Sequence, residues 1–313
     1  MPSDHLKFRQ LVSACEGMPP APIAVAHPCD LPSLEGALEA ARAGLVTPIL
    51  VGPEQRIRSL AQSAGIDLNG CEIAHAPHSH AAAEESVRLV REGRASLLMK
   101  GSLHTDELMA AVVRQGDGLR TARRISHCFI MDVPTLDHLL IISDAAINIA
   151  PSLEDKVDIV QNAVDLALAI GMPEALVAIL SAMETVNPKV PSTIEAAALC
   201  KMADRGQITG ATLDGPLALD NAINLRAAQI KHIASPVAGR ANVLIVPDLE
   251  AGNMLAKSLS FLADADAAGV VMGARVPIVL TSRADSGMSR LVSCAAAVLL
   301  ANARRSTLAR SLT

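Results

Sequence analysis

The sequence has 313 residues, a formal net charge of −5, 50% hydrophobic residues and 19% charged residues. At roughly 150 residues per domain this length predicts two domains, and the hydrophobic half excludes an intrinsically disordered chain. The acidic balance, with no Trp, no Tyr and only three Phe, argues against a nucleic-acid partner, because nucleic-acid binding uses basic surfaces and aromatic stacking.

No uncharged stretch reaches the roughly 20 apolar residues of a membrane helix, so no membrane partner is expected. The charged residues Asp4, Lys7 and Arg9 are not typical of a secretory signal, and we expect a cytoplasmic protein. Six cysteines occur without a Cys-x-x-Cys pair, and no metal site is predicted from them. The histidines at 75, 78 and 80 indicate a solvent-facing loop more than a metal site, whereas His104 and His127 are candidate site neighbours.

Short apolar runs alternate with helical patterns along the chain. The first half predicts strands at 23–26, 48–51, 71–75 and 95–99, separated by helices at 34–43, 53–64, 81–91 and 105–114. The runs 128–133 and 139–143 flank Pro134 and predict antiparallel neighbours. Strands at 176–180, 208–213, 243–246 and 276–280 follow, with helices at 153–170, 193–205, 219–231, 252–262 and 287–303. This alternation predicts an α/β fold with doubly wound sheets, whose ligands bind beyond the carboxyl ends of strands.

Four polar loops follow predicted strands, at 100–105, 214–222, 247–253 and 281–286. Helix N-termini in such loops favour anions, although the same polar residues also serve as helix caps or turn residues. The candidate ligand-binding residues are Lys100, Gly101, Ser102, His104, Thr105, Asp214, Gly252, Asn253 and Ser286.

The segments LMKGSLHT (98–105), DGPL (214–217), PDLEAGN (247–253) and SRADS (282–286) resemble, in this order, the phosphate acetyltransferase and phosphate butyryltransferase family. The resemblance spans about residues 23–301, and the first two segments are nearer the butyryltransferase branch. It implies two doubly wound α/β lobes with a cleft between them, similar to the isocitrate/isopropylmalate dehydrogenase-like fold. The first lobe would be discontinuous, with residues 1–133 and 274–313, and the second would hold residues 134–273.

The reaction implied by the resemblance is acyl-CoA + phosphate ⇌ acyl phosphate + CoA, by direct thiol attack in a ternary complex. Coenzyme A is then a substrate, no tightly bound cofactor or metal is implied, and acyl-CoA, inorganic phosphate and acyl phosphate are the partners. A homodimer or larger homo-oligomer is also implied.

Arg283 suits phosphate, because a guanidinium offers two parallel hydrogen bonds, and Ser282 suits the developing oxyanion. Asp285 is the candidate base, but the acetyltransferases of this family have an aspartate where Ser289 stands here, which leaves a positioning or capping role for Asp285 open. The basic group Arg120, Arg123 and Arg124 is either a site for the CoA phosphates or an ordinary solvated run.

Two alternatives stay open at this point. A metal- and NAD-dependent dehydrogenase of the isocitrate, isopropylmalate or pyridoxine-pathway type shares a similar fold, but the last predicted strands carry no Asp-x-x-x-Asp cluster. A non-catalytic CoA- or acyl phosphate-binding sensor would keep the fold without turnover.

Overall fold

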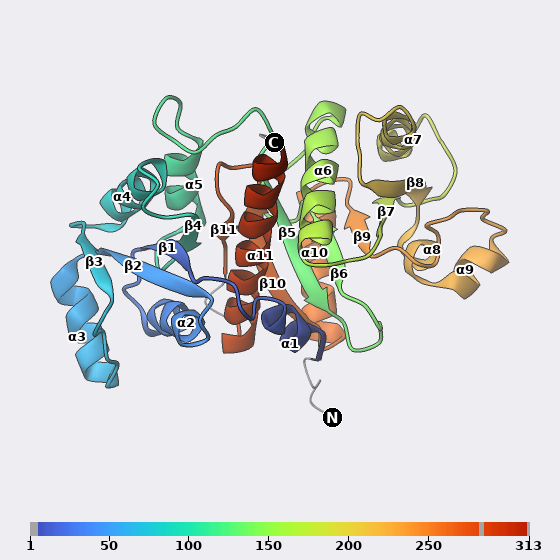
Figure 1. Ribbon diagram of the computed structural model, residues 1–313. Coiled ribbons are helices and arrows are strands. Elements are labelled where there is room, and N and C mark those ends of the chain that lie inside the picture. Colours follow the sequence, from blue (N-terminus) through green and yellow to red (C-terminus); the bar gives the residue numbers. More distant parts are fainter. Residues whose placement is uncertain (1–5, 282–284, 312–313) are drawn as a thin grey trace. The chain divides into compact units, whose positions relative to one another are not determined.

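The computed structural model describes residues 6–281 and 285–311, and the chain divides into two compact units (Figure 1). The N-terminal unit contains residues 8–123 and the chain from 268 onward, and the central unit contains residues 124–267 together with the chain up to Lys7. The chain thus crosses between units at 7/8, 123/124 and 267/268, whereas the predicted lobes change at 133 and 273. The crossing at 123/124 precedes the antiparallel pair at 126–143 because both strands of that pair belong to the central unit.

The N-terminal unit is built on parallel strands in the order β3-β2-β1-β4-β11, with β10 beside β11. Only β10 is antiparallel to its neighbour β11 in the pairings within this unit. These strands are β1 (Ala21–Ala26), β2 (Val46–Gly52), β3 (Glu72–His75), β4 (Leu97–Lys100), β10 (Asp266–Met272) and β11 (Ile278–Val279).

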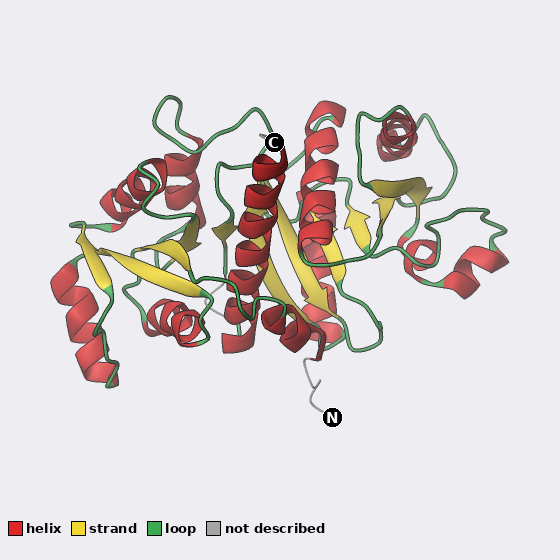
Figure 2. Ribbon diagram, viewed as in Figure 1, coloured by secondary structure: helices red, strands yellow, loops and turns green. Residues whose placement is uncertain are grey.

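The helices of this unit pack in pairs, α2 against α11 and α4 against α5. In Figure 2 these helices are drawn in red and lie over the yellow strands. Their bounds are α1 (Leu6–Ser13), whose first two residues lie before the unit begins, α2 (Leu31–Arg42), α3 (Glu54–Ala64), α4 (Ser79–Arg91), α5 (Thr105–Val113) and α11 (Gly287–Ser311).

The central unit has the strand order β5-β6-β9-β7-β8, with only the β5–β6 pair antiparallel among its described pairings. Its strands are β5 (Ser126–Asp132), β6 (Leu140–Ser143), β7 (Ala175–Leu180), β8 (Ala211–Leu217) and β9 (Val243–Ile245). Its helices are α6 (Leu153–Ala169), α7 (Pro191–Asp204), α8 (Leu219–Ile223), α9 (Leu225–Ile230) and α10 (Leu249–Leu262).

The buried strands carry uninterrupted apolar runs, as expected for parallel strands covered on both faces. All residues of β4, β6 and β9 are buried. Polar residues begin several helices: the carboxylate of Asp30 accepts from Ser33 N at 3.0 Å, and that of Asp248 accepts from Ala251 N at 2.9 Å. None of the described helices is both long and apolar enough to cross a bilayer.

Three local predictions are wrong. The predicted helix over 219–231 is two helices, because Asn224 ends α8 and its side chain accepts from Ala227 N at 3.0 Å to begin α9. The DGPL segment lies within β8 and not in a loop after a strand; Pro216 is tolerated because β8 is an edge strand. Strand β10 was not predicted, because its Ala and Gly residues have low strand propensity.

Candidate functional site

Three loops meet at the carboxyl ends of neighbouring parallel strands in the N-terminal unit. Ala26 of β1 pairs with Lys100 of β4, and Val279 of β11 pairs with Met99 of β4. The segments that follow these strands, at 27–30, 101–104 and 280–286, therefore begin side by side. Lys100, the last residue of β4, lines a small hollow there together with Asp30, Ser33, Thr281 and Arg290.

Lys100 is 9% exposed, and its Nζ donates to the carbonyl oxygen of Gly101 at 3.2 Å. Its long side chain thus stays at the end of the strand and does not extend to bulk solvent. A buried cation at this edge is suited to a phosphate or another anionic group.

Gly101 allows the loop after β4 to cross the end of β1. A Cβ on Gly101 would lie 2.3 Å from the carbonyl oxygen of Ala26 and 2.5 Å from that of His27. The close approach that glycine permits is to the protein's own backbone. The role of Gly101 in binding a ligand stays a prediction.

Ser102 orients His27, a residue that the sequence did not single out. The Ser102 hydroxyl donates to the carbonyl oxygen of His27 at 2.8 Å, and its oxygen lies 2.9 Å from His27 Nδ1. Because the single hydroxyl proton points at the carbonyl, Nδ1 must carry the proton that joins the ring to Ser102. The other ring nitrogen, Nε2, then holds the lone pair.

Burial lowers the pKa of His27 from its ordinary value, and the nearby Arg56 lowers it further. The imidazole is consequently neutral at pH 7 and able to accept a proton at Nε2. Its backbone has φ of 56°, in the left-handed region that few residues other than Gly and Asn adopt. A histidine directly after an apolar strand was the only sequence signal for this residue.

His104 and Thr105 begin α5. His104 is its N-cap, and the His104 backbone N–H donates to the Glu107 carboxylate at 3.0 Å. Glu107 also accepts from Ser79 Oγ at 3.1 Å and lies 3.1 Å from His80 Nδ1. His78 in turn accepts from Ala81 N as the N-cap of α4. These histidines thus serve helix ends, and the described residues contain no group of three potential metal ligands.

The predicted catalytic residues Ser282 and Arg283 lie outside the described residues. Thr281, immediately before them, is buried, and Asp285 follows them. The carbonyl oxygen of Asp285 accepts from Arg290 Nη1 at 2.6 Å. The Oγ of Ser286 accepts from Ser289 N at 3.0 Å at the start of α11. The role of Asp285, as base, positioning residue or cap, stays a prediction.

Ser289, at the position where the acetyltransferase pattern has an aspartate, is 4% exposed. Its hydroxyl oxygen accepts from Ser286 Oγ at 3.0 Å. In this chain the position is filled by a buried hydroxyl within the first turn of α11.

The arginines predicted as one basic group lie on both sides of the boundary between the two units. Arg124 belongs to the central unit, where its Nε donates to Asn148 Oδ1 at 2.7 Å and its Nη1 lies 3.2 Å from Asp155. Arg120 and Arg123 belong to the N-terminal unit, and Arg120 lines a separate basic hollow there. A role of the three residues in binding the CoA phosphates stays a prediction.

In the central unit, the segment after β6 surrounds a buried carboxylate. Asp144 accepts from the backbone N–H groups of Ala146, Ile147 and Asn148 at 2.9–3.1 Å. Asp144 was not among the predicted site residues. Burial strongly lowers the pKa of the neighbouring His127, although the Asp144 charge opposes this shift. His127 Nδ1 is buried without a hydrogen-bond partner.

Two predicted ligand-binding residues of the central unit, Gly252 and Asn253, lie against Ala145 in the segment after β6. A Cβ on Gly252 would lie 3.0 Å from Ala145 Cα and 2.7 Å from Val246 Cγ2, and Asn253 Nδ2 donates to Ala145 O at 3.1 Å. Asp214 accepts from Gly215 N at 2.8 Å. An added Cβ on Gly252 would thus meet protein atoms, and the prediction that Gly252 permits close approach to a ligand stays untested.

The chain belongs to the family described as phosphate acetyl/butaryl transferase, which its residues 79–298 match. It is 64% identical to a phosphate acetyltransferase of Rhizobium meliloti, over 97% of this chain and 96% of that protein. It is 40% identical to a phosphate butyryltransferase of Clostridium acetobutylicum, over 94% of this chain and 98% of that protein.

Solved structures share the fold. A branched-chain phosphotransacylase from Enterococcus faecalis matches with a TM-score of 0.78 and 29% identity, covering 90% of this chain and 99% of that one. A 4-hydroxythreonine-4-phosphate dehydrogenase from Klebsiella pneumoniae matches with a TM-score of 0.53 and 13% identity, covering 90% and 99%. The second likeness concerns the fold alone and supports the predicted dehydrogenase-like architecture without supporting a dehydrogenase function.

Proposed function

We propose that this protein catalyses the reversible transfer of a short acyl group, acetyl or butyryl, between CoA and inorganic phosphate. The family match over residues 79–298 carries the proposal. The cluster of Lys100, neutral His27 and the start of the 281–286 segment at one strand edge supports it, because acyl transfer to and from phosphate needs a cation, a base and an oxyanion donor.

In the direction that forms acyl-CoA, the CoA thiol loses its proton, sulfur attacks the acyl carbonyl carbon, and the carbon–oxygen bond to phosphate breaks. Arg283 and Lys100 bind the departing phosphate, and the Ser282 hydroxyl donates to the carbonyl oxygen as negative charge develops there. Asp285, which follows Ser282 and Arg283 in the same segment, positions these two residues.

For the base we propose His27, with Nε2 as the proton acceptor. An aspartate with an ordinary pKa near 3.9 is poorly matched to a thiol near 8.5, whereas an imidazole is closer and is neutral at pH 7. The hydrogen bond from His27 Nδ1 to Ser102 supports the required tautomer. Asp285 remains the second candidate for this role.

We propose further that no acyl-enzyme forms. The described cysteines are poor nucleophiles, because burial raises the pKa of Cys128, Cys200 and Cys294 to about 12 and that of Cys15 to about 11. Direct attack by the CoA thiol in a ternary complex needs no protein nucleophile. A homo-oligomeric assembly and a cytoplasmic location stay predictions.

The purified protein should release CoA from acetyl-CoA or butyryl-CoA only when inorganic phosphate is added. Propionyl-CoA serves as the intermediate chain length, and the ratio of kcat/KM values defines acyl preference. Absence of phosphate-dependent CoA release from all three would refute the transferase proposal and favour a non-catalytic sensor.

A further inference from the structure

A basic hollow lies near the amino ends of β4 and β11, whereas Lys100 lies at the carboxyl end of β4. Helix α4 begins after β3 and ends at Arg91, before the amino end of β4, and α5 runs from the Lys100 loop to Val113. Arg275 lies just before the amino end of β11. Arg91, Arg114 and Arg275 therefore gather where the parallel strands β4 and β11 begin, whereas the candidate active-site loops follow the points where they end.

The hollow has a volume of about 290 Å³ and is lined by Arg91, Arg114, Arg120 and Arg275, with Gln115, Gly116 and Gly118. No Asp or Glu is among these lining residues. Arg114 is already paired with Glu84 and Asp117, which do not line the hollow. The guanidinium groups of Arg91, Arg120 and Arg275 repel one another unless an anion joins them.

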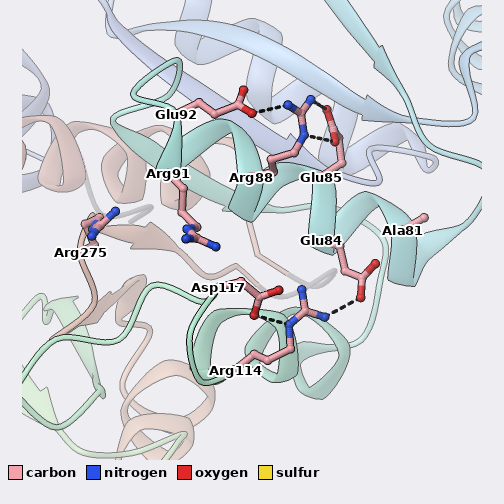
Figure 3. Close-up of a pocket in the computed structure, with 9 residues that line it drawn as sticks. All are labelled: Ala81, Glu84, Glu85, Arg88, Arg91, Glu92, Arg114, Asp117 and Arg275. Atoms are coloured by element: carbon pink, nitrogen blue, oxygen red, sulfur yellow. Dashed lines mark hydrogen bonds and ion pairs between the residues drawn. The ribbon is translucent and has the colours of Figure 1, made fainter.

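A larger adjoining hollow of about 680 Å³ does contain carboxylates, but these pair with Arg88 and Arg114 (Figure 3). Arg88 pairs with Glu85 and Glu92, and Arg114 lies 2.6 Å from Glu84 and 2.7 Å from Asp117. Arg114 is the main cause of the lowered pKa of Asp117, to which Arg91 contributes least.

By contrast, no hydrogen bond or ion pair joins the guanidinium groups of Arg91, Arg120 and Arg275 to any other part of the chain that the structure describes. In Figure 3, Arg91 points away from its own helix toward the side where Asp117 lies, and no interaction is drawn from Arg91 or Arg275. These side chains keep their donors available.

The backbone around the hollow is held in place. Arg275 N donates to Leu119 O at 2.8 Å, Arg120 forms an antiparallel bridge with Ala274, and Thr121 Oγ1 donates to Gly273 O at 2.7 Å. A further contact, Arg304 Nη1 to Ala274 O at 3.2 Å, holds the same segment. The Cα positions of Arg120 and Arg275 are thus fixed beside each other before any ligand binds, which reduces the ordering cost of binding.

We propose that Arg91, Arg120 and Arg275 form a binding site for a compact polyanion, such as a molecule with two or more linked phosphoryl groups, separate from the acyl-transfer site. Such an anion accepts charge-assisted hydrogen bonds from several guanidinium groups at once. A lone monophosphate engages fewer of them and binds more weakly.

Inorganic tripolyphosphate is the probe, and isothermal titration calorimetry at fixed ionic strength is the measurement, since the protein has neither Trp nor Tyr as a fluorescent reporter. We expect one tripolyphosphate site per chain that remains in the presence of saturating CoA. Arg91→Gln and Arg275→Gln should each weaken binding by about tenfold or more. Asp117→Asn should strengthen it, because it releases Arg114 from one carboxylate.

The matched control is Arg58→Gln, which removes an exposed arginine paired with Glu54 on α3 and should leave tripolyphosphate affinity unchanged. Unchanged binding in both the Arg91 and Arg275 variants, no binding to the native protein, or displacement of tripolyphosphate by CoA would each overturn the proposal. Phosphate-dependent CoA release by the folded variants is measured separately, so the outcome is independent of the proposed acyl transfer.

Discussion

The role proposed for His27 is best tested by His27→Asn. Asparagine tolerates the positive φ of 56° found there, and its amide donates a hydrogen bond to Ser102 Oγ, but it has no nitrogen that accepts a proton. The substitution thus removes the proposed base while retaining the backbone conformation and a polar partner for Ser102.

General-base catalysis contributes about 10²–10⁴-fold, and kcat/KM for acyl-CoA formation should fall by that factor in His27→Asn. Ser102→Ala should have a smaller effect, because it removes the orienting hydrogen bonds, each contributing about 1 kcal/mol, while the imidazole remains. His75→Asn, which alters an exposed histidine at the end of β3, is the matched control and should retain native activity.

The pH profile separates a base from a structural residue. Protonated His27 cannot accept the thiol proton, and its pKa is lowered, so native kcat/KM should fall only on acidification below the ordinary histidine value of about 6.5. This acidic limb should be absent in His27→Asn. Less than a threefold loss of kcat/KM together with an unchanged acidic limb would refute the assignment, and Asp285 would become the principal candidate.

Three further predictions concern Arg283, Gly252 and His127. Arg283→Lys should lower activity by about 10- to 150-fold, because lysine keeps the charge but loses the planar pair of donors, and Arg283→Gln should cost more; near-native kcat and phosphate KM in either folded variant would contradict this. Gly252→Ala should lower the free energy of unfolding by about 1–3 kcal/mol, measured by urea unfolding, because the added Cβ meets Ala145 and Val246. An unchanged free energy of unfolding would show that Ala145 and Val246 move to make room for the methyl group. His127 in the unfolded chain takes up a proton near pH 6.5, whereas burial keeps it neutral in the folded chain, so the free energy of unfolding should fall as the pH drops from 7 to 5. His127→Leu should make the free energy of unfolding less dependent on pH over this range. An equal pH dependence in the two proteins would contradict the prediction.

Much of the fold was predictable from local pattern. The apolar run before Lys100 predicted a strand buried on both faces, and β4 is completely buried. The two runs on either side of Pro134 predicted antiparallel neighbours, and β5 and β6 pair in that way. Strand β10 was not predicted because it begins with Asp, Ala and Gly, which have low strand propensity, and its pairing with the predicted strand β11 is a tertiary contact.

The site required long-range contacts. The sequence identified Lys100, Ser102 and the 282–286 segment by their order and residue types, since these features are local. It could not show that Ser102 selects the tautomer of His27, 75 residues away, or that Gly101 and Gly252 lie tightly against other parts of the protein. Nor could it show that Arg120 and Arg124, four positions apart, belong to different units, with Arg120 beside Arg275. Sequence thus determined the elements and the chemistry available at their ends, because periodicity and residue type act over a few residues; the tertiary structure alone decided which of those groups meet, because strand pairing joins residues far apart in the chain.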